Sequence, residues 1–225
     1  MTRLAPILIA IGFALVMYRF SAWKAGKTLD AQSTVLDDPA LLALTKRMAR
    51  QLDVSDLKVY VHEIAPINGL AAPDGRIFIT RGFMDKYRGG IVSAEELSSV
   101  IAHELGHVAL GHSKRRMLDF AGANAVRVVL IMLIGRFIPF VGPYLANLLI
   151  SMLTARLSRQ DEYEADAYAA ALLTKSGIGV GAQISMFEKL DTLAGGANGQ
   201  LAWLMSHPKT GERIAALKTL EKGWA

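Results

Sequence analysis

Two histidines four residues apart, with a glutamate directly after the first, are the residues of this chain best suited to chemistry. On a helix, His103 and His107 share one face, where both imidazoles can bind a single zinc ion. Glu104 is then turned by about 100° from His103, beside the ion rather than on it. A carboxylate in that position can act as the general base that takes a proton from zinc-activated water. Because this short pattern also arises by chance, the rest of the chain has to support it.

A further metal ligand is expected from a carboxylate. The chain has 225 residues and no cysteine, so zinc would be held by His, Asp or Glu. Zinc hydrolases commonly use three protein ligands and leave a fourth position to water. Glu162 and Asp166 share the otherwise apolar face of a helix predicted from residue 158 to about residue 177. We therefore expect one Zn²⁺ per chain, held by His103, His107 and Glu162, with Asp166 accepting the second N–H of a ligand histidine.

Neighbouring titratable residues are predicted to lie outside this site. His112 is five residues past His107, about 140° around a continuous helix, and is interpreted as structural or interfacial. Glu164 falls about 200° from Glu162 and is expected to be solvated, with Asp161 as a local cap or a surface charge.

His207 lies in a predicted loop before the final helix, and three roles stay open for it. It can donate to the oxyanion of the tetrahedral intermediate, or bind zinc as a removable extra ligand that keeps the site at rest. It can also simply fasten the loop.

The two histidines are positioned by a helix predicted to begin after Ser93. The Ser93 side chain can accept first-turn amides, and Glu96 can reach back to the Ser93 amide. Apolar residues recur at helical spacing, so the helix is expected to be largely buried. They are Leu97, Val100, Ile101, Leu105 and Val108.

A small sheet is expected before this helix. Residues 57–64 alternate as in a strand, and residues 67–80 predict two strands joined by a Pro-Asp-Gly turn. Pro73 cannot donate to a ladder and belongs at a strand end or a sheet edge. An edge beside a peptidase site can pair with an extended substrate backbone. The candidate substrate-binding residues are Asn68, Leu70, Ala71 and Ala72.

The apolar segments predict contact with a membrane. Residues 1–23 are interpreted as an N-terminal transmembrane helix, with a cleaved signal peptide as the alternative. Residues 24–38 form a polar linker to a catalytic domain at 39–225. Within it, residues 126–153 predict an apolar helical hairpin that dips into one leaflet, or else a pair of buried core helices.

The charge pattern agrees with a lipid bilayer as partner. The net charge is +5, but Lys and Arg are scattered or flank apolar segments, which favours headgroups over nucleic acid. The positive-inside rule slightly favours a cytoplasmic catalytic part. The fold class is therefore α+β, mostly helical with a small mixed sheet, plus the membrane helix and the hairpin.

These motifs together resemble family M48, the membrane-linked zinc metallopeptidases that include the HtpX-like bacterial proteases and the CAAX prenyl endopeptidases. The resemblance covers about residues 39–220. Its motifs are His103-Glu104-x-x-His107, Glu162-x-x-Ala165-Asp166, Asn68-x-x-Ala71-x-Pro73-x-Gly75-x-Ile77, Ser158-Arg159 and Ser206-His207-Pro208. It implies a zincin-like, gluzincin-type core with zinc on two histidines and a glutamate, in a bacterial-type inner membrane. The chain departs from HtpX-like proteins in having one N-terminal anchor rather than a pair, and it lacks the many spans of the prenyl endopeptidases.

The function expected from the sequence is that of a membrane-anchored zinc endopeptidase acting on misfolded or membrane-associated proteins. One alternative is a zinc-binding membrane scaffold or chaperone-like protein without proteolysis. Another is an exported metallohydrolase acting on a small molecule. The sequence does not define the oligomeric state.

Overall fold

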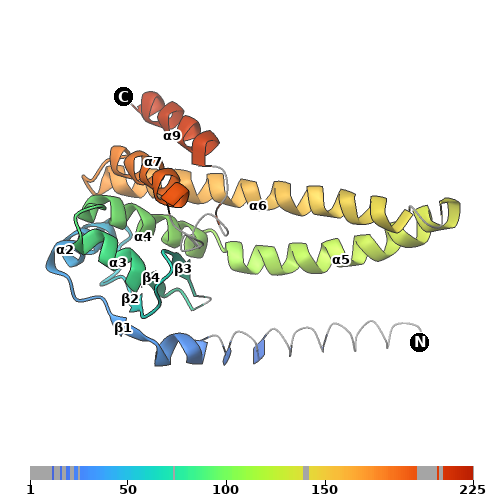
Figure 1. Cartoon of the computed structure of the whole chain (residues 1–225), viewed down its shortest axis with the longest axis horizontal. Helices are drawn as coiled ribbons and strands as arrows, with labels where there is room; N and C mark the ends of the chain where they lie inside the picture. The colour runs from blue at the N-terminus through green and yellow to red at the C-terminus, as the bar shows by residue number, and fades with distance from the viewer. Residues whose placement is uncertain are drawn as a thin grey trace.

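A long helical hairpin extends from a body in which helices pack on a small sheet (Figure 1). The computed structural model describes residues 12, 16, 19–20, 23–24, 26–72, 74–138, 142–196, 207 and 210–224. The elements run in the order β1 (Ser33–Val35), α2 (Pro39–Gln51), β2 (Val59–His62), β3 (Gly69–Ala71), β4 (Ile77–Thr80), α3 (Arg81–Arg88), α4 (Ala94–Ala109), α5 (His112–Phe137), α6 (Gly142–Lys175), α7 (Gly181–Gly196) and α9 (Thr210–Trp224). The described fold is mostly helical with a small mixed sheet, as predicted.

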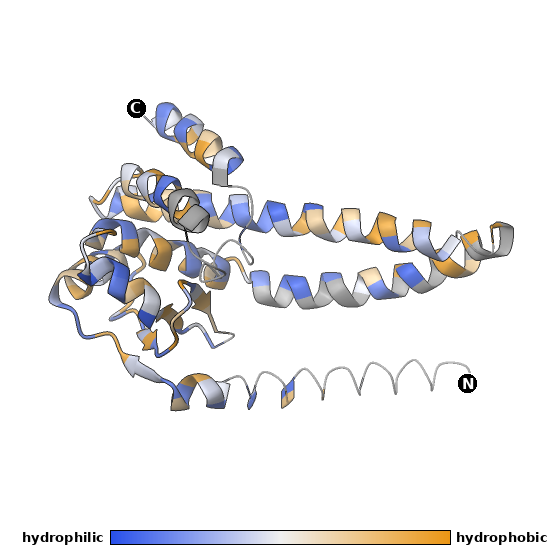
Figure 2. Ribbon diagram, in the orientation of Figure 1, coloured by the Kyte–Doolittle hydropathy of each residue, from blue (hydrophilic) through white to orange (hydrophobic). Residues whose placement is uncertain are grey.

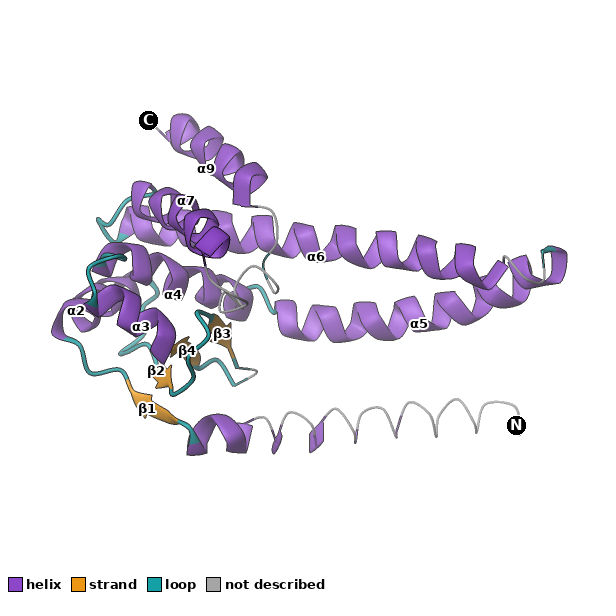
Figure 3. Ribbon diagram, in the orientation of Figure 1, coloured by secondary structure: helices purple, strands orange, loops and turns teal. Residues whose placement is uncertain are grey.

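The sheet has the strand order β1-β2-β4-β3 (Figure 3). The β2–β4 pair is parallel, whereas β1–β2 and β3–β4 are antiparallel. This order leaves β3 at one edge. Pro73, predicted at a strand end or a sheet edge, lies outside the described residues. The other edge is β1, which comes from the predicted linker and pairs with β2 with Ser33 opposite His62. That strand is too short and too polar to be recognised from alternation.

Helix α4 begins with the predicted capping box. The Ser93 hydroxyl accepts a hydrogen bond from the Glu96 amide at 3.1 Å, and the Glu96 carboxylate accepts one from the Ser93 amide at 2.7 Å. The same carboxylate also binds Ser185 at 2.6 Å and Lys189 at 2.7 Å, both on α7. The start of α4 is thereby fastened to a helix more than 80 residues away in sequence.

Helices α4 and α6 approach each other backbone to backbone at a glycine. A Cβ atom added to Gly106 would lie 2.9 Å from the Ala165 carbonyl oxygen and 3.0 Å from its Cα. Gly106 lies between His103 and His107, and Ala165 lies between Glu162 and Asp166. The close crossing therefore brings the two pairs of predicted site residues side by side.

The hairpin consists of α5 and α6, which run antiparallel and side by side (Figure 1). Helix α6 is continuous from Gly142 to Lys175, so the second half of the apolar tract and the predicted Glu162 helix are one element. The first part of α6 is hydrophobic, as its orange stretch shows (Figure 2). Several of its large apolar side chains are exposed, among them Leu148 and Met152.

The predicted N-terminal transmembrane helix falls mostly outside the described residues. Among the helices that the structure does describe, none combines the length and the apolar content that a bilayer span requires.

Candidate metal centre and active site

Three predicted ligand side chains converge between α4 and α6. The Nε2 atoms of His103 and His107 lie 3.1 Å apart. The Glu162 carboxylate oxygens lie 3.4 Å from Nε2 of His103 and 3.5 Å from Nε2 of His107. All three side chains are buried.

The separations between these ligand atoms are similar to those in a zinc site. With Zn–N and Zn–O bonds of about 2.0–2.2 Å, the corners of a tetrahedral site lie about 3.3–3.6 Å apart. The separations of 3.1, 3.4 and 3.5 Å are close to that spacing. The residues present therefore fit a zinc ion without rearrangement of the helices.

His103 is oriented by a buried ion pair behind it. Its Nδ1 lies 2.9 Å from Oδ1 of Asp166, whose carboxylate also accepts hydrogen bonds of 2.6 and 2.7 Å from the guanidinium of Arg213. Arg213 is only 1% exposed, and its guanidinium also lies over the ring of Phe187 at 4.5 Å. Asp166 thus holds the Nδ1 proton of His103, which turns Nε2 toward the other ligands.

Arg213 is a residue of the site that was not predicted from the sequence. An arginine on a predicted amphipathic helix is normally solvated, and the only available signal was its place one residue before Ile214 on the inward face of α9. Its burial depends on the carboxylate of Asp166, which is 47 residues away.

The electrostatic environments of the two histidines differ. Burial acts to lower the pKa of His103, but hydrogen bonds to Asp166 and Glu162 outweigh it and raise the pKa to about 9. Burial, together with the charge of His103, lowers the pKa of His107 to about 2. Burial also acts to raise the pKa of Glu162, yet hydrogen bonds from His103 and His207 hold it far below the usual range. Imidazole binds zinc in its neutral form, so a zinc ion held by His103 would displace the proton from Nε2.

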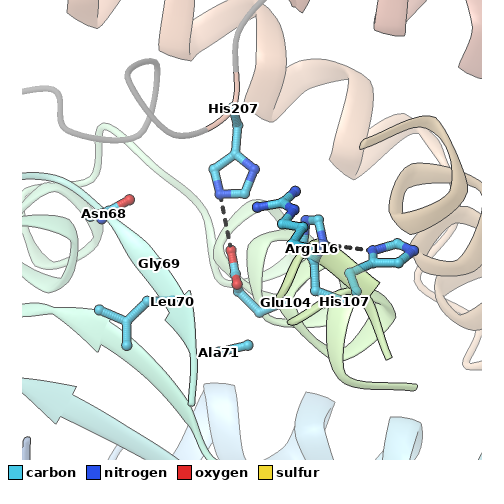
Figure 4. Close-up of a pocket in the computed structure, with 9 residues that line it drawn as sticks. Asn68, Gly69, Leu70, Ala71, Glu104, His107, Arg116 and His207 are labelled. Atoms are coloured by element: carbon cyan, nitrogen blue, oxygen red, sulfur yellow. Dashed lines mark hydrogen bonds and ion pairs between the residues drawn. The ribbon is translucent and has the colours of Figure 1, made fainter. Parts of the chain in front are cut away.

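Glu104 is buried beside this group. Glu104 is only 2% exposed, and its Oε1 has no hydrogen-bond partner among the described residues. Nε2 of His207 lies 3.6 Å from this oxygen, within ion-pair distance. In Figure 4 the Glu104 carboxylate points toward His207 across the pocket. A buried carboxylate oxygen without a partner is a ready acceptor for a water proton.

The pocket has a volume of about 180 Å³. Asn68, Leu70 and Ala71 lie along one side of it on β3 and the residue before it, opposite Glu104 and His107 (Figure 4). Ala72 is buried outside this lining, and its amide is bonded to the Arg76 carbonyl oxygen at 2.8 Å. Of the four predicted substrate-binding residues, three therefore face the pocket.

His207 completes the ligand group. Its Nδ1 lies 2.6 Å from the Glu162 carboxylate and 3.4 Å from Nε2 of His103. Together with His107, these residues form a buried group whose ligand atoms all lie within 4.8 Å of one another.

The direction predicted for His112 and a surface position for Asp161 were wrong, and Glu164 is only partly exposed. His112 was expected to point away from the site, but its Nδ1 lies 2.7 Å from Nδ1 of His107. Asp161, expected as a local cap or a surface charge, is 1% exposed and pairs with Arg115 and Arg116 at 3.0 Å each. Glu164, expected to be solvated, has a side chain that is 32% exposed and pairs with Arg115 at 2.9 Å.

A buried carboxylate whose Oε1 accepts no hydrogen bond within the described part of the chain lies next to ligand groups at zinc spacing and a sheet edge. This arrangement suits hydrolysis of peptide bonds with zinc as cofactor, and this chain is a zinc metalloendopeptidase. The sequence model of Peptidase family M48 matches residues 36–221, and the chain belongs to that family. The predicted family, cofactor and enzyme class are confirmed.

Three relatives illustrate the similarity. The chain is 31% identical to Metalloprotease LoiP of Escherichia coli (strain K12) over 178 residues, which cover 79% of this chain and 68% of LoiP. It is 29% identical to Metalloprotease YcaL of the same organism, with 79% of this chain and 67% of YcaL covered. It is 27% identical to a Protease HtpX homolog of Salinibacter ruber (strain DSM 13855 / M31), with 96% of this chain and 87% of the homolog covered.

Proposed function

We propose that this chain is a membrane-anchored endopeptidase for misfolded or membrane-associated proteins, with zinc held by His103, His107 and Glu162. The observation that carries this proposal is the spacing of 3.1–3.5 Å between their ligand atoms, with the carboxylate of Glu104 beside them, whose buried Oε1 accepts no hydrogen bond from the described residues. A zinc site with a purely structural role has no need for that buried carboxylate.

Each residue of the site has a separate role in the proposed reaction. Zinc, when bound, supplies a Lewis acid that acidifies water and polarises the substrate carbonyl. Glu104 takes the proton of the attacking water and later delivers it to the leaving amine. Asp166 keeps the Nδ1 proton of His103, and Arg213 keeps Asp166 ionised by bonding both of its oxygens.

The substrate backbone is proposed to pair with the β3 edge. Support comes from the position of β3 at the end of the strand order and from its lining of the pocket. An extended peptide gains main-chain hydrogen bonds there, whereas a small molecule has no use for a strand edge. Asn68 offers the substrate a further acceptor, since its buried Oδ1 has no partner in the described part of the chain. Ala72, at the end of the same segment, would limit how far the pairing extends.

His207 is proposed to hold the fourth position at rest and to move when substrate binds. This role is supported by its place in the buried ligand group, with Nδ1 3.4 Å from Nε2 of His103. The hydrogen bond of 2.6 Å to Glu162 would lengthen when both residues bind the ion. The His207→Ala variant separates this role from oxyanion donation. A resting ligand predicts an equal or higher rate, while loss of an oxyanion donor predicts a fall of about 10²–10³ in kcat.

Membrane association is assigned to two segments, the anchor at 1–23 and the hairpin at 126–153. The linker at 24–38 joins the anchor to a catalytic domain at 39–225, which contains the hairpin. Exposed apolar side chains on the hairpin support this assignment. They include Met132 at 69%, Tyr144 at 77%, Leu148 at 56% and Met152 at 62% exposure. The membrane is proposed to be of the bacterial inner type, with the domain on the cytoplasmic side.

Flotation with phosphatidylethanolamine and phosphatidylglycerol vesicles tests the hairpin. The double variant Leu148→Glu and Met152→Glu should lose most vesicle binding in a chain that lacks residues 1–23. Val54→Glu is the matched control, because Val54 is 45% exposed on the body of the molecule. Equal loss in both variants would remove the hairpin from the proposal.

The central experiment compares Glu104→Gln with Glu95→Gln, an exposed glutamate in the first turn of the same helix. Glu104→Gln should retain one zinc per chain and lose cleavage of an unfolded model protein, whereas Glu95→Gln should keep both. Chelation should abolish wild-type cleavage and added zinc should restore it. Equal cleavage by Glu104→Gln would refute the assigned base, and a zinc-loaded wild type without cleavage would favour the scaffold alternative.

A further inference from the structure

The chain turns sharply between α4 and α5, directly after the metal helix. Helix α4 ends at Ala109, Gly111 has a φ of +67°, and α5 begins at His112. A left-handed conformation of this kind is readily available to glycine and ends the helix. The turn brings the imidazole of His112 back against His107, where it is 1% exposed.

The contact between the two imidazoles fixes which nitrogens carry protons. Nδ1 of His112 lies 2.7 Å from Nδ1 of His107, and such a contact needs one donor and one acceptor. A histidine that binds zinc through Nε2 keeps its proton on Nδ1, so His107 is the donor and Nδ1 of His112 is the acceptor. The His112 proton must then reside on Nε2, which faces the Glu164 carboxylate at 3.3 Å.

The carboxylates that face His112 are themselves held in place. Arg115 donates to Glu164 at 2.9 Å and to Asp161 at 3.0 Å, and Arg116 donates to Asp161 at 3.0 Å. Arg116 also donates to Glu162 at 3.0 Å, which joins this network to the ligand group. The acceptor for the His112 proton is therefore fixed by ion pairs.

His112, Asp161 and Glu164 also have the composition of a second metal site. Two guanidinium groups already neutralise the two carboxylates, and their positive charge opposes a cation in the same place. Nδ1 of His112 is in addition engaged with His107. The group is thus better suited to support the zinc centre than to bind a metal of its own.

We propose that His112 is a positioning residue for the metal centre. Its Nδ1 accepts the Nδ1 proton of His107 while its Nε2–H is anchored on Glu164, and this relay holds the His107 ring in the tautomer and orientation that bind zinc. Each ligand histidine then has its own buried support, Asp166 for His103 and His112 for His107. The proposal rests on the proposed role of His107 as a zinc ligand.

Zinc affinity, measured by chelator competition on the full chain, tests this role. His112→Leu removes the acceptor at similar size and should weaken zinc binding by about 10–100-fold. His112→Asn carries an amide oxygen near the Nδ1 position and should recover most of that loss. The absorption spectrum of the cobalt-substituted protein should shift in His112→Leu and return toward wild type in His112→Asn.

A matched control is available elsewhere in the chain. His62 is also buried, with Nδ1 bonded to the Ser33 hydroxyl at 3.2 Å and near the Gln32 carbonyl oxygen at 3.1 Å. His62→Leu should leave zinc affinity and the cobalt spectrum unchanged. Unfolding in excess chelator reports any loss of stability separately from loss of zinc. If His112→Leu does not fold, Glu164→Leu and Glu164→Gln provide the same comparison at the other end of the relay, where only the Gln variant retains an acceptor.

Three results would overturn the proposal. They are wild-type zinc affinity in His112→Leu, no recovery in His112→Asn, and a second zinc equivalent that disappears with His112. The underlying ligand assignment is tested separately by His107→Ala. If that variant keeps wild-type zinc affinity, the proposed metal site itself is wrong, whatever His112 does.

Discussion

Replacing Gly106 by alanine should separate metal binding from helix stability. The added Cβ would lie 2.9 Å from the Ala165 carbonyl oxygen and 3.0 Å from its Cα, against an ordinary contact of at least 3.4 Å. Both atoms belong to a helix backbone, so α4 and α6 must separate by about 0.4–0.5 Å, whereas a metal site tolerates only about 0.2 Å. We expect at least a tenfold loss of zinc affinity, of the order seen when the support of a metal ligand is lost.

The effect on folding should be much smaller than a simple clash suggests. Alanine gains about 1 kcal/mol over glycine inside a helix, while overpacking costs about 1–3 kcal/mol. The free energy of unfolding in excess chelator should therefore change by no more than about 2 kcal/mol. Zinc affinity is measured by chelator competition, and stability by urea denaturation.

Gly122 provides the matched control for this experiment. It lies inside α5, and a Cβ added there would meet nothing within 4 Å. Gly122→Ala should raise the free energy of unfolding by about 0.5–1 kcal/mol without changing zinc affinity. If Gly106→Ala also gains stability and keeps its zinc, the helix crossing does not set the spacing of the site.

Two further predictions concern buried charges. Burial acts to raise the pKa of Glu96, but hydrogen bonds from Lys189, Ser185 and the Ser93 amide outweigh it and lower the pKa. A lowered folded pKa gives stability that is present above the unfolded value of about 4.3 and is lost as pH falls through the folded value. Glu96→Gln should thus lower the free energy of unfolding by about 1.5–3 kcal/mol at pH 7, and by progressively less as the pH is lowered below 4. If urea denaturation gives a difference that does not change with pH, the charge argument is refuted. Arg213→Met should destabilise the chain by about 3–5 kcal/mol, because it leaves the buried Asp166 carboxylate without its ion pair, and adding Asp166→Asn should recover much of that loss in the same assay.

Much of the site could be predicted because its signals are local. Helix geometry alone puts His103 and His107 on one face, and Ser93 with Glu96 specifies where that helix begins. The absence of cysteine and the apolar face around Glu162 were enough to expect a carboxylate as the further ligand. An edge or a strand end near Pro73 could be expected because proline cannot donate to a ladder, and β3, which ends at Ala71, is an edge strand.

The features of the fold and the site that could not be predicted depend on contacts between residues far apart in the sequence. The strand β1 exists because β2 offers it a partner, and Arg213 is buried because Asp166 neutralises it. The error for His112 has the same cause, since the angle expected from a continuous helix fails once Gly111 turns the chain. A pattern within one element carries no information about such partners.

By itself, the sequence determined which side chains can bind zinc and which helices carry them, because periodicity and capping act over a few residues. Only the tertiary structure decided how those side chains meet. The spacing of the two histidines from Glu162 depends on the close crossing of α4 and α6 at Gly106, and the orientation of each ring depends on buried groups supplied by other helices. These are properties of packing, in which distant residues exclude water together and fix one another's charges.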